Sequence, residues 1–178
     1  GKKIFADLKL FDIPATVASA VRQLARHEVD FCTVHGNDGM LRAAAEAKGS
    51  MQILAVTALT SLDQGDLDDL GFQCDAKTLV LSRARRALEA GCDGVVSSGL
   101  EVGALRESVD HVLVTVCPGI RPIFNDEVPA EDDQQRVMTP ARAIASGADY
   151  LVIGRPIRDA ANPRAAAEAI QEQIASAL

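Results

Sequence analysis

The sequence has no tryptophan, and aromatic residues make up only 3% of its 178 residues. This scarcity argues against a platform on which nucleic-acid bases stack on aromatic rings. Positive charge is also in the minority, with 18 Lys and Arg against 25 Asp and Glu and a formal net charge of −7. Proteins that bind duplexes usually carry the opposite sign, so we expect no nucleic-acid polymer as a partner. A local basic pocket for a phosphate group stays open.

Long apolar runs, paired cysteines and a dinucleotide fingerprint are missing as well. No run approaches the roughly 20 apolar residues that a membrane span needs, and no secretory signal opens the chain, so we expect no membrane partner. Cys32, Cys74, Cys92 and Cys117 form no CxxC pair. They predict reduced thiols of a cytoplasmic protein, not a zinc site or a disulfide framework. The sequence has no GxGxxG motif and no group of His, Cys or carboxylate residues at the spacing of metal ligands. We therefore expect no cofactor and no metal.

The sequence does contain short apolar runs that alternate with helical patterns. The apolar runs are 4–9, 31–35, 52–57, 94–97, 112–116 and 150–153. The helical patterns cover about 16–26, 40–47, 79–90, 102–106, 140–145 and 163–177, and a polar loop is expected over 118–136. Such alternation predicts a parallel sheet in one domain, residues 1–178, because each crossover helix returns the chain for another parallel strand. A barrel and an open, doubly wound sheet both fit this pattern.

Polar side chains collect where the apolar runs end. They include Asp7, Lys9, Asp12, His35, Thr57, Thr60, Ser97, Ser98, Arg121 and Arg155. Functional side chains at the carboxyl ends of parallel strands favour a barrel whose site is built from several strands. A lone histidine in this position is more often a packing residue than a catalyst. We therefore expect His35 to pack against the residues of the site without contacting the ligand.

Three charges, Asp7, Lys9 and Asp12, lie within six residues at the end of the first run. Asp7 and Lys9 point to the same face of a strand because the side-chain period is two. One interpretation is a solvated cluster of ion pairs at a strand edge. The other is chemical. A lysine flanked by two carboxylates stays protonated, which argues against a Schiff base and for a general acid that protonates a developing carbanion.

Two loops combine glycine with arginine, at 118–122 and at 153–157. Loops at the ends of the last strands of a barrel often hold a phosphate through backbone N–H groups and an arginine. Gly154 allows close approach of a ligand, and Arg155 can form two parallel hydrogen bonds to a phosphate. A turn beside a solvated charge would explain either loop by itself. Two such loops, with Gln134 between them, favour a phosphate ligand.

The stretch DLKLFDIPAT at 7–16 resembles the DxKxxDIPxT signature of the orotidine 5′-phosphate decarboxylase family. The resemblance continues in order through 33–36, 56–61, 91–96, 118–122, 133–140 and 147–157, and covers nearly the whole chain. DxKxxD alone is shared with related sugar-phosphate enzymes. The ordered set, above all Asp133 and Gln134 followed by Gly154 and Arg155, is specific to the orotidylate branch.

The resemblance implies an α/β fold, a (β/α)8 TIM barrel, in a homodimer. It implies conversion of orotidine 5′-monophosphate to uridine 5′-monophosphate in pyrimidine biosynthesis, without metal or cofactor. Lys9 would protonate C6, Asp7 would lie against the substrate carboxylate, and Asp12 would reach across the dimer interface into the partner's site. The substrate-binding residues would be Thr16, Thr60, Arg121, Gln134, Gly154 and Arg155.

The family has two β/α units before its DxKxxD strand, which supply an Asp at the ribose and a further Lys. Only six residues precede Asp7, so we expect this chain to supply six β/α units, strands 3–8, of an N-terminally incomplete barrel. Two alternatives stay open. One is a Mg²⁺-dependent sugar-phosphate synthase or decarboxylase of the same superfamily, and the other is a non-catalytic phosphate-binding homologue.

Overall fold

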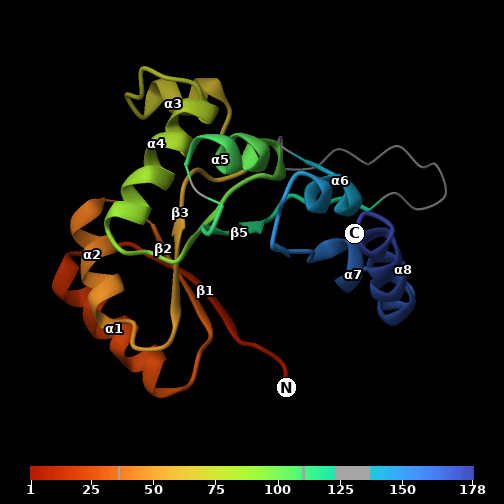
Figure 1. The fold of residues 1–178 in the computed structure, drawn as a ribbon, viewed down its shortest axis with the longest axis horizontal. Coiled ribbons are helices and arrows are strands. Elements are labelled where there is room, and N and C mark those ends of the chain that lie inside the picture. The colour runs from red at the N-terminus through yellow and green to blue at the C-terminus, as the bar shows by residue number, and fades with distance from the viewer. Residues whose placement is uncertain (36, 110, 123–136) are drawn as a thin grey trace.

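The computed structural model describes residues 1–35, 37–109, 111–122 and 137–178. Its strands are β1 (Phe5–Leu10), β2 (Phe31–His35), β3 (Gln52–Val56), β4 (Gly94–Val96), β5 (Val114–Cys117) and β6 (Tyr150–Leu151). Its helices are α1 (Pro14–Arg26), α2 (Asp38–Ala47), α3 (Gln64–Asp69), α4 (Ala76–Glu89), α5 (Val102–Ser108), α6 (Pro140–Ala145), α7 (Arg155–Arg158) and α8 (Pro163–Ala175), with a 3₁₀ turn, η1, at Gly99–Glu101. Figure 1 shows how they follow one another.

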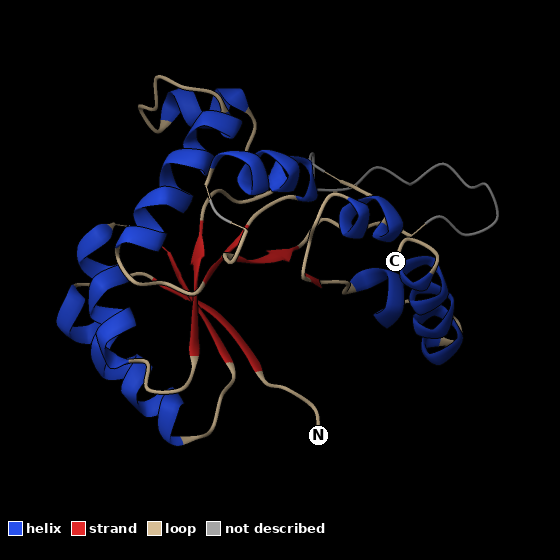
Figure 2. Ribbon diagram, viewed as in Figure 1, coloured by secondary structure: helices blue, strands red, loops and turns tan. Residues whose placement is uncertain are grey.

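The six strands form one parallel sheet in the order β1-β2-β3-β4-β5-β6, which is also their order in the chain. Figure 2 shows the strands at the centre and the helices around the outside of the curved sheet. A doubly wound sheet reverses its strand order at a switch point, whereas a β/α barrel adds each strand beside the previous one. The barrel prediction is therefore confirmed, and the open-sheet alternative is wrong.

The two faces of the sheet carry different cores. On β2, Cys32 and Val34 pack outward in the large cluster that also holds Val17 of α1. Phe31 packs inward with the buried side chains of the neighbouring strands. Its ring lies 5.3 Å from that of Tyr150 in an edge-to-face contact. Because Tyr150 belongs to β6, this contact shows that the sheet curves far enough for β2 and β6 to meet across the inner face.

An aspartate precedes every second strand and binds the strand before it. These residues are Asp30 before β2, Asp93 before β4 and Asp149 before β6. Their carboxylates accept hydrogen bonds from backbone N–H groups of Ile4 (2.7 Å), Ile53 (2.8 Å) and Thr115 (2.7 Å). Each carboxylate therefore joins the start of an even-numbered strand to the odd-numbered strand before it, or for Asp30 to Ile4 directly ahead of β1, at the amino end of the sheet.

The residue two positions before each of these aspartates lies in the left-handed region of backbone conformation. It is Glu28 with φ 54°, Gly91 with φ 88° and Gly147 with φ 99°. Glycine adopts this conformation without steric cost, and residues with a Cβ do not. The same helix-to-strand turn therefore recurs three times, once with a glutamate where the other two copies have glycine.

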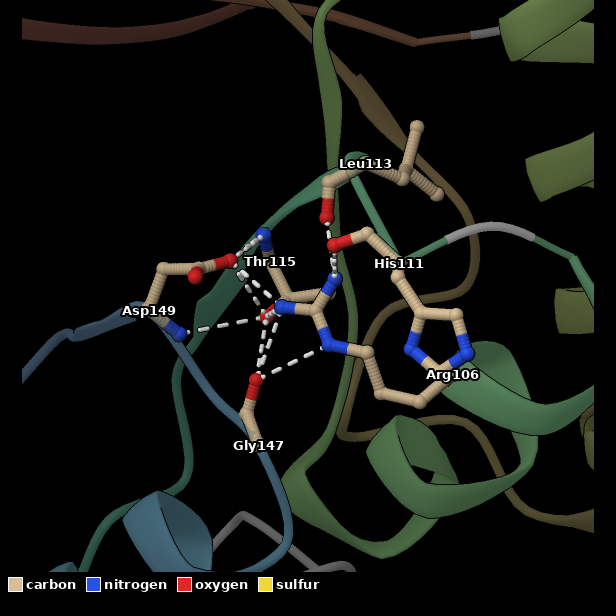
Figure 3. A network of polar contacts seen from close by, with 6 residues as sticks. All are labelled: Arg106, His111, Leu113, Thr115, Gly147 and Asp149. Carbon is tan, nitrogen blue, oxygen red and sulfur yellow. Dashed lines mark hydrogen bonds and ion pairs between the residues drawn. The ribbon is translucent and has the colours of Figure 1, made fainter.

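Arg106 of α5 forms hydrogen bonds to residues at the amino ends of both β5 and β6 (Figure 3). Its guanidinium pairs with Asp149 at 2.6 Å and donates to Thr115 Oγ1 at 3.0 Å. It also donates to the carbonyl oxygens of His111 (3.1 Å), Leu113 (2.6 Å) and Gly147 (2.7 Å). A charged group with this many partners stabilises the end of the barrel opposite to the predicted site.

Several boundaries differ from the sequence-based expectation. Helices α3 and α7 were not predicted, and β6 ends at Leu151, two residues short of the predicted run. Helix α4 begins at Ala76 and not at 79, because the Asp75 side chain caps it by accepting the Thr78 N–H at 2.7 Å. None of the helices in the described ranges is long and apolar enough to cross a membrane.

Candidate active site

Lys9 and Asp7 form an ion pair on β1, with 2.6 Å between Nζ and Oδ2. Both side chains are 39% exposed, so the pair faces open space at the carboxyl half of the strand. The backbone of Lys9 is left-handed, with φ 48°. The pairing of β1 with β2 shifts between Ala6 and Leu10, which marks a bulge around this lysine.

The hydroxyl of Thr33 on β2 links both members of this pair. It donates to Asp7 Oδ1 at 2.9 Å and accepts the backbone N–H of Lys9 at 2.8 Å. Thr33 itself is completely buried. Sequence reasoning missed this residue, because a β-branched side chain in a buried strand is expected for packing alone.

The Lys9–Asp7 pair opens into a cavity of about 320 Å³ on the inner side of the sheet. Thr60, one of the predicted substrate-binding residues, also lines it. The full lining is Phe5, Asp7, Lys9, Val56, Ala58, Leu59, Thr60, Ser61, Val96, Pro118 and Val152. The site thus draws on the ends of several strands, as expected for a barrel.

A second cavity, of about 400 Å³, holds the predicted phosphate residues. Its lining is Pro118, Gly119, Arg121, Val152, Gly154, Arg155 and Arg158. The structure therefore brings Arg121 together with Gly154 and Arg155, which lie more than 30 positions further along the chain. Arg158 was not predicted, although its spacing of three from Arg155 places both on one face of a helical turn.

The two cavities adjoin, because Pro118 and Val152 line both of them. One end of the combined space carries an ammonium and a carboxylate, and the other end carries guanidinium groups. An elongated ligand with an anionic terminus fits this division of charge, since arginine is suited to phosphate by its planar fork of donors.

The remaining predicted residues lie apart from these cavities or outside the described ranges. The exposed Asp12 accepts the N–H of Ile13 at 2.6 Å, and no ion pair joins it to Lys9 among the described residues. The expectation that two carboxylates flank Lys9 therefore holds for Asp7 only. Thr16 is exposed in the first turn of α1. Gln134 falls within 123–136, which the structure does not describe.

His35, at the end of β2, lines neither cavity. Its ring lies 5.7 Å from that of Phe11 in an edge-to-face contact. Burial, helped by the positive charges of Arg83 and Lys9, lowers the pKa of His35 below its usual value. The imidazole is therefore neutral near pH 7, which suits a packing residue beside a cationic site.

Strands in chain order, charged groups at strand ends and an arginine-lined cavity together define a β/α-barrel protein with its site at the carboxyl ends of the strands. Comparison with known families makes this more specific. Residues 1–170 match the model of the orotidine 5′-phosphate decarboxylase / HUMPS family. The chain belongs to this family.

Relatives with this name are close in sequence and in structure. The orotidine 5′-phosphate decarboxylase of Methylococcus capsulatus is 65% identical over 173 residues, 97% of this chain and 70% of that protein. The one of Nitrobacter winogradskyi is 49% identical over 180 residues, 100% of this chain and 73% of that protein. The crystal structure of the Lactobacillus acidophilus enzyme superposes with a TM-score of 0.83 at 36% identity, covering 98% of this chain and 76% of that one.

Proposed function

We propose that this chain forms the greater part of an enzyme that decarboxylates orotidine 5′-monophosphate to uridine 5′-monophosphate in pyrimidine biosynthesis. The observation that carries the proposal is the pair of adjoining cavities, one with Lys9 and Asp7 and one with Arg121 and Arg155. A nucleotide places its base and its phosphate at opposite ends of one molecule, and this matches the separation of charge in the combined cavity.

In the proposed reaction the bond between C6 and the carboxylate breaks, and its electron pair stays on C6. Lys9 Nζ gives a proton to C6 as carbon dioxide leaves, and the resulting amine regains a proton from water. Lys9 is a suitable donor because its ammonium group faces the cavity and is held by Asp7 at 2.6 Å. General acids placed in this way contribute roughly 10²–10⁴-fold to rate.

Asp7 has a second role in this proposal, against the carboxylate of the substrate. Two unit charges about 4 Å apart repel by roughly 4 kcal/mol at an effective dielectric of 20. The repulsion ends when carbon dioxide departs, so it favours the transition state over the ground state. Thr60, buried in the same cavity, would contact the pyrimidine.

The phosphate would bind in the second cavity, with Arg121, Gly154 and Arg155 as its partners. Thr16 and Gln134 complete the proposed set of substrate contacts on the strength of the family resemblance. Bidentate hydrogen bonds between arginine and phosphate are among the stronger polar contacts in proteins. This cavity therefore supplies binding energy away from the reacting carbon.

We further propose a homodimer in which Asp12 enters the partner's site. Asp12 is exposed and does not pair with the Lys9 of its own chain. Phe11 and Ile13 on either side of it are 67% and 65% exposed. Exposed apolar side chains beside a functional residue are typical of an interaction surface.

We also propose a cytoplasmic location. The four free thiols, three of them buried, are in keeping with a reducing, cytoplasmic location.

The main alternative is a Mg²⁺-dependent enzyme of the same family. Among the described residues, no group of three or more His, Cys, Asp or Glu side chains is placed to hold a metal ion. Metal independence stays a prediction, which EDTA tests. Turnover that survives exhaustive chelation supports the proposal, and turnover that is lost with EDTA and restored by Mg²⁺ favours the alternative.

The decisive test is Lys9→Ala in the complete gene product. We expect decarboxylation to fall by at least roughly 10³-fold, because the proton donor is gone. Binding of uridine 5′-monophosphate should persist, since the phosphate cavity is intact. Lys77→Ala, on the exposed surface of α4, is the matched control and should leave turnover unchanged. Appreciable turnover by Lys9→Ala would contradict the proposal.

A further inference from the structure

The Thr33 hydroxyl is positioned to control both members of the Lys9–Asp7 pair. Asp7 divides its two carboxylate oxygens between strands: Oδ1 accepts from Thr33 at 2.9 Å, and Oδ2 contacts Lys9 Nζ at 2.6 Å. With one oxygen fixed by β2, the plane of the carboxylate is set and the second oxygen faces the ammonium group.

The same hydroxyl also binds the backbone of the bulge. Four residue steps on β1, from Ala6 to Leu10, correspond to only two steps on β2, from Cys32 to Val34. The sheet ladder therefore has no regular partner for the Lys9 N–H, and Thr33 Oγ1 accepts it at 2.8 Å. Lys9 is held in a left-handed conformation, φ 48°, that disfavours residues with a Cβ.

We propose that Thr33 is a positioning residue for the decarboxylation: its hydroxyl fixes the direction of the Asp7 carboxylate and the bulged backbone from which the Lys9 ammonium extends. The inference rests on the proposed function of Lys9 and Asp7. Thr33 does not line either cavity and touches no part of the substrate in this proposal. Loss of the Thr33 hydroxyl should therefore lower kcat and hardly change KM, because the phosphate cavity does not depend on this hydroxyl.

Thr33→Val is the sharpest variant, since it replaces the hydroxyl with a methyl group of nearly the same size. In the complete gene product we expect kcat to fall by roughly 10–100-fold, with KM changed by less than about threefold. Thr33→Ser keeps the hydroxyl and should retain kcat within about threefold of the wild type. If Thr33→Val does not fold, Thr33→Ala removes the hydroxyl without placing an apolar group against Asp7.

Thr115→Val is the matched control, because Thr115 is equally buried and its hydroxyl serves the Arg106 and Asp149 network at the opposite end of the sheet. It should lower the melting temperature and leave kcat unchanged below that temperature. A folded Thr33→Val protein with unchanged kcat would overturn the inference. So would a Thr33→Ser protein that loses as much activity as Thr33→Val.

A readout without turnover separates this inference from the proposed function. In a crystal structure of Thr33→Val we expect the carboxylate of Asp7 to rotate and the backbone at Lys9 to leave φ 48°. Retention of both the 2.6 Å ion pair and the left-handed backbone would overturn the positioning role, whatever the activity. A wild-type protein that binds uridine 5′-monophosphate but does not decarboxylate its precursor would instead contradict the proposed function.

Discussion

Arg155 and Arg158 lie three residues apart on the single turn of α7, and both line the cavity proposed to hold the phosphate. Arg158 forms an ion pair with Asp159 at 2.6 Å in a setting where its side chain is 71% exposed. Because the Asp159 carboxylate neutralises part of the Arg158 charge at close range, we expect Arg158 to contribute only modestly to phosphate binding.

Arg155→Ala should raise KM for the nucleotide by roughly 30- to 100-fold, a loss of a few kcal/mol expected for a charge-assisted contact to phosphate. Arg158→Ala should raise it less than about tenfold. Arg164→Ala, an equally drastic change on the exposed face of α8, should have no effect. Steady-state kinetics at fixed ionic strength measures all three. A KM unchanged in Arg155→Ala would argue against phosphate binding at this end.

Complementation between two inactive proteins tests the dimer. If Asp12 acts in the partner's site, mixing Lys9→Ala with Asp12→Ala produces hybrid dimers that contain one site with both wild-type residues. Up to about a quarter of wild-type activity should return in a fully exchanged equal mixture. Labelled subunits must show that exchange has occurred. Complete exchange without recovery of activity would indicate that Asp12 serves its own subunit.

Glu28→Gly should stabilise the fold. Glu28 has φ 54°, whereas the matching positions of the other two helix-to-strand turns are glycine. A left-handed residue with a Cβ costs roughly 1–2 kcal/mol, so we expect the free energy of unfolding to rise by about 1 kcal/mol. Urea denaturation measures this change. Gly91→Ala is the reciprocal control and should destabilise, and a neutral or negative effect of Glu28→Gly would show that this strain is relieved elsewhere.

Thiol reactivity should separate the four cysteines. Burial raises the pKa of Cys32 to about 11, and burial also raises the pKa values of Cys92 and Cys117 to about 12. At pH 8 these thiols are almost entirely protonated in the folded protein, and a thiol reacts as its thiolate. A disulfide reagent should therefore modify Cys74 first, and all four thiols only in denaturant. Rapid modification of three or four thiols in the native protein would contradict this prediction.

The same shifts predict a loss of stability in alkali. Above the ordinary thiol pKa of 9.0, the unfolded chain releases protons that the folded chain retains. The unfolded state then binds fewer protons, so the free energy of unfolding falls as pH rises from about 9 towards 12. Unfolding midpoints measured across this range should decrease, and Cys117→Ala should make the decrease shallower. An equal slope in that variant would assign the loss to other groups.

The parallel sheet and the Lys9–Asp7 pair could be predicted because both follow from short-range patterns. Alternating elements define a parallel sheet, and a spacing of two places side chains on one face. The structure reaches the same ion pair through a bulge at Lys9, which no pattern in the sequence indicates. The role of Thr33 could not be predicted for a related reason. Only the fold shows that the backbone N–H of Lys9 lies within hydrogen-bond distance of the Thr33 hydroxyl.

Local polar contacts account for other differences. Helix α3 has little apolar periodicity, but its capping box between Asp63 and Asp66 could have indicated its start. The spacing from Lys9 to Asp12 suggested a second flanking carboxylate. The chain instead turns between Phe11 and Pro14, and Asp12 accepts the N–H of Ile13 within that turn. A contact of this kind competes with longer-range pairing and is invisible to spacing alone.

The carboxylates of Asp30, Asp93 and Asp149 each bind the strand that was made immediately before their own. The sequence separations are 26, 40 and 34 residues, so each of these contacts joins neighbouring segments of the chain. Contacts that are close in the sequence form quickly and at a low cost in loop entropy. During synthesis each even-numbered strand can therefore pair with the strand before it once both have emerged, and each finished pair presents an edge for the next one.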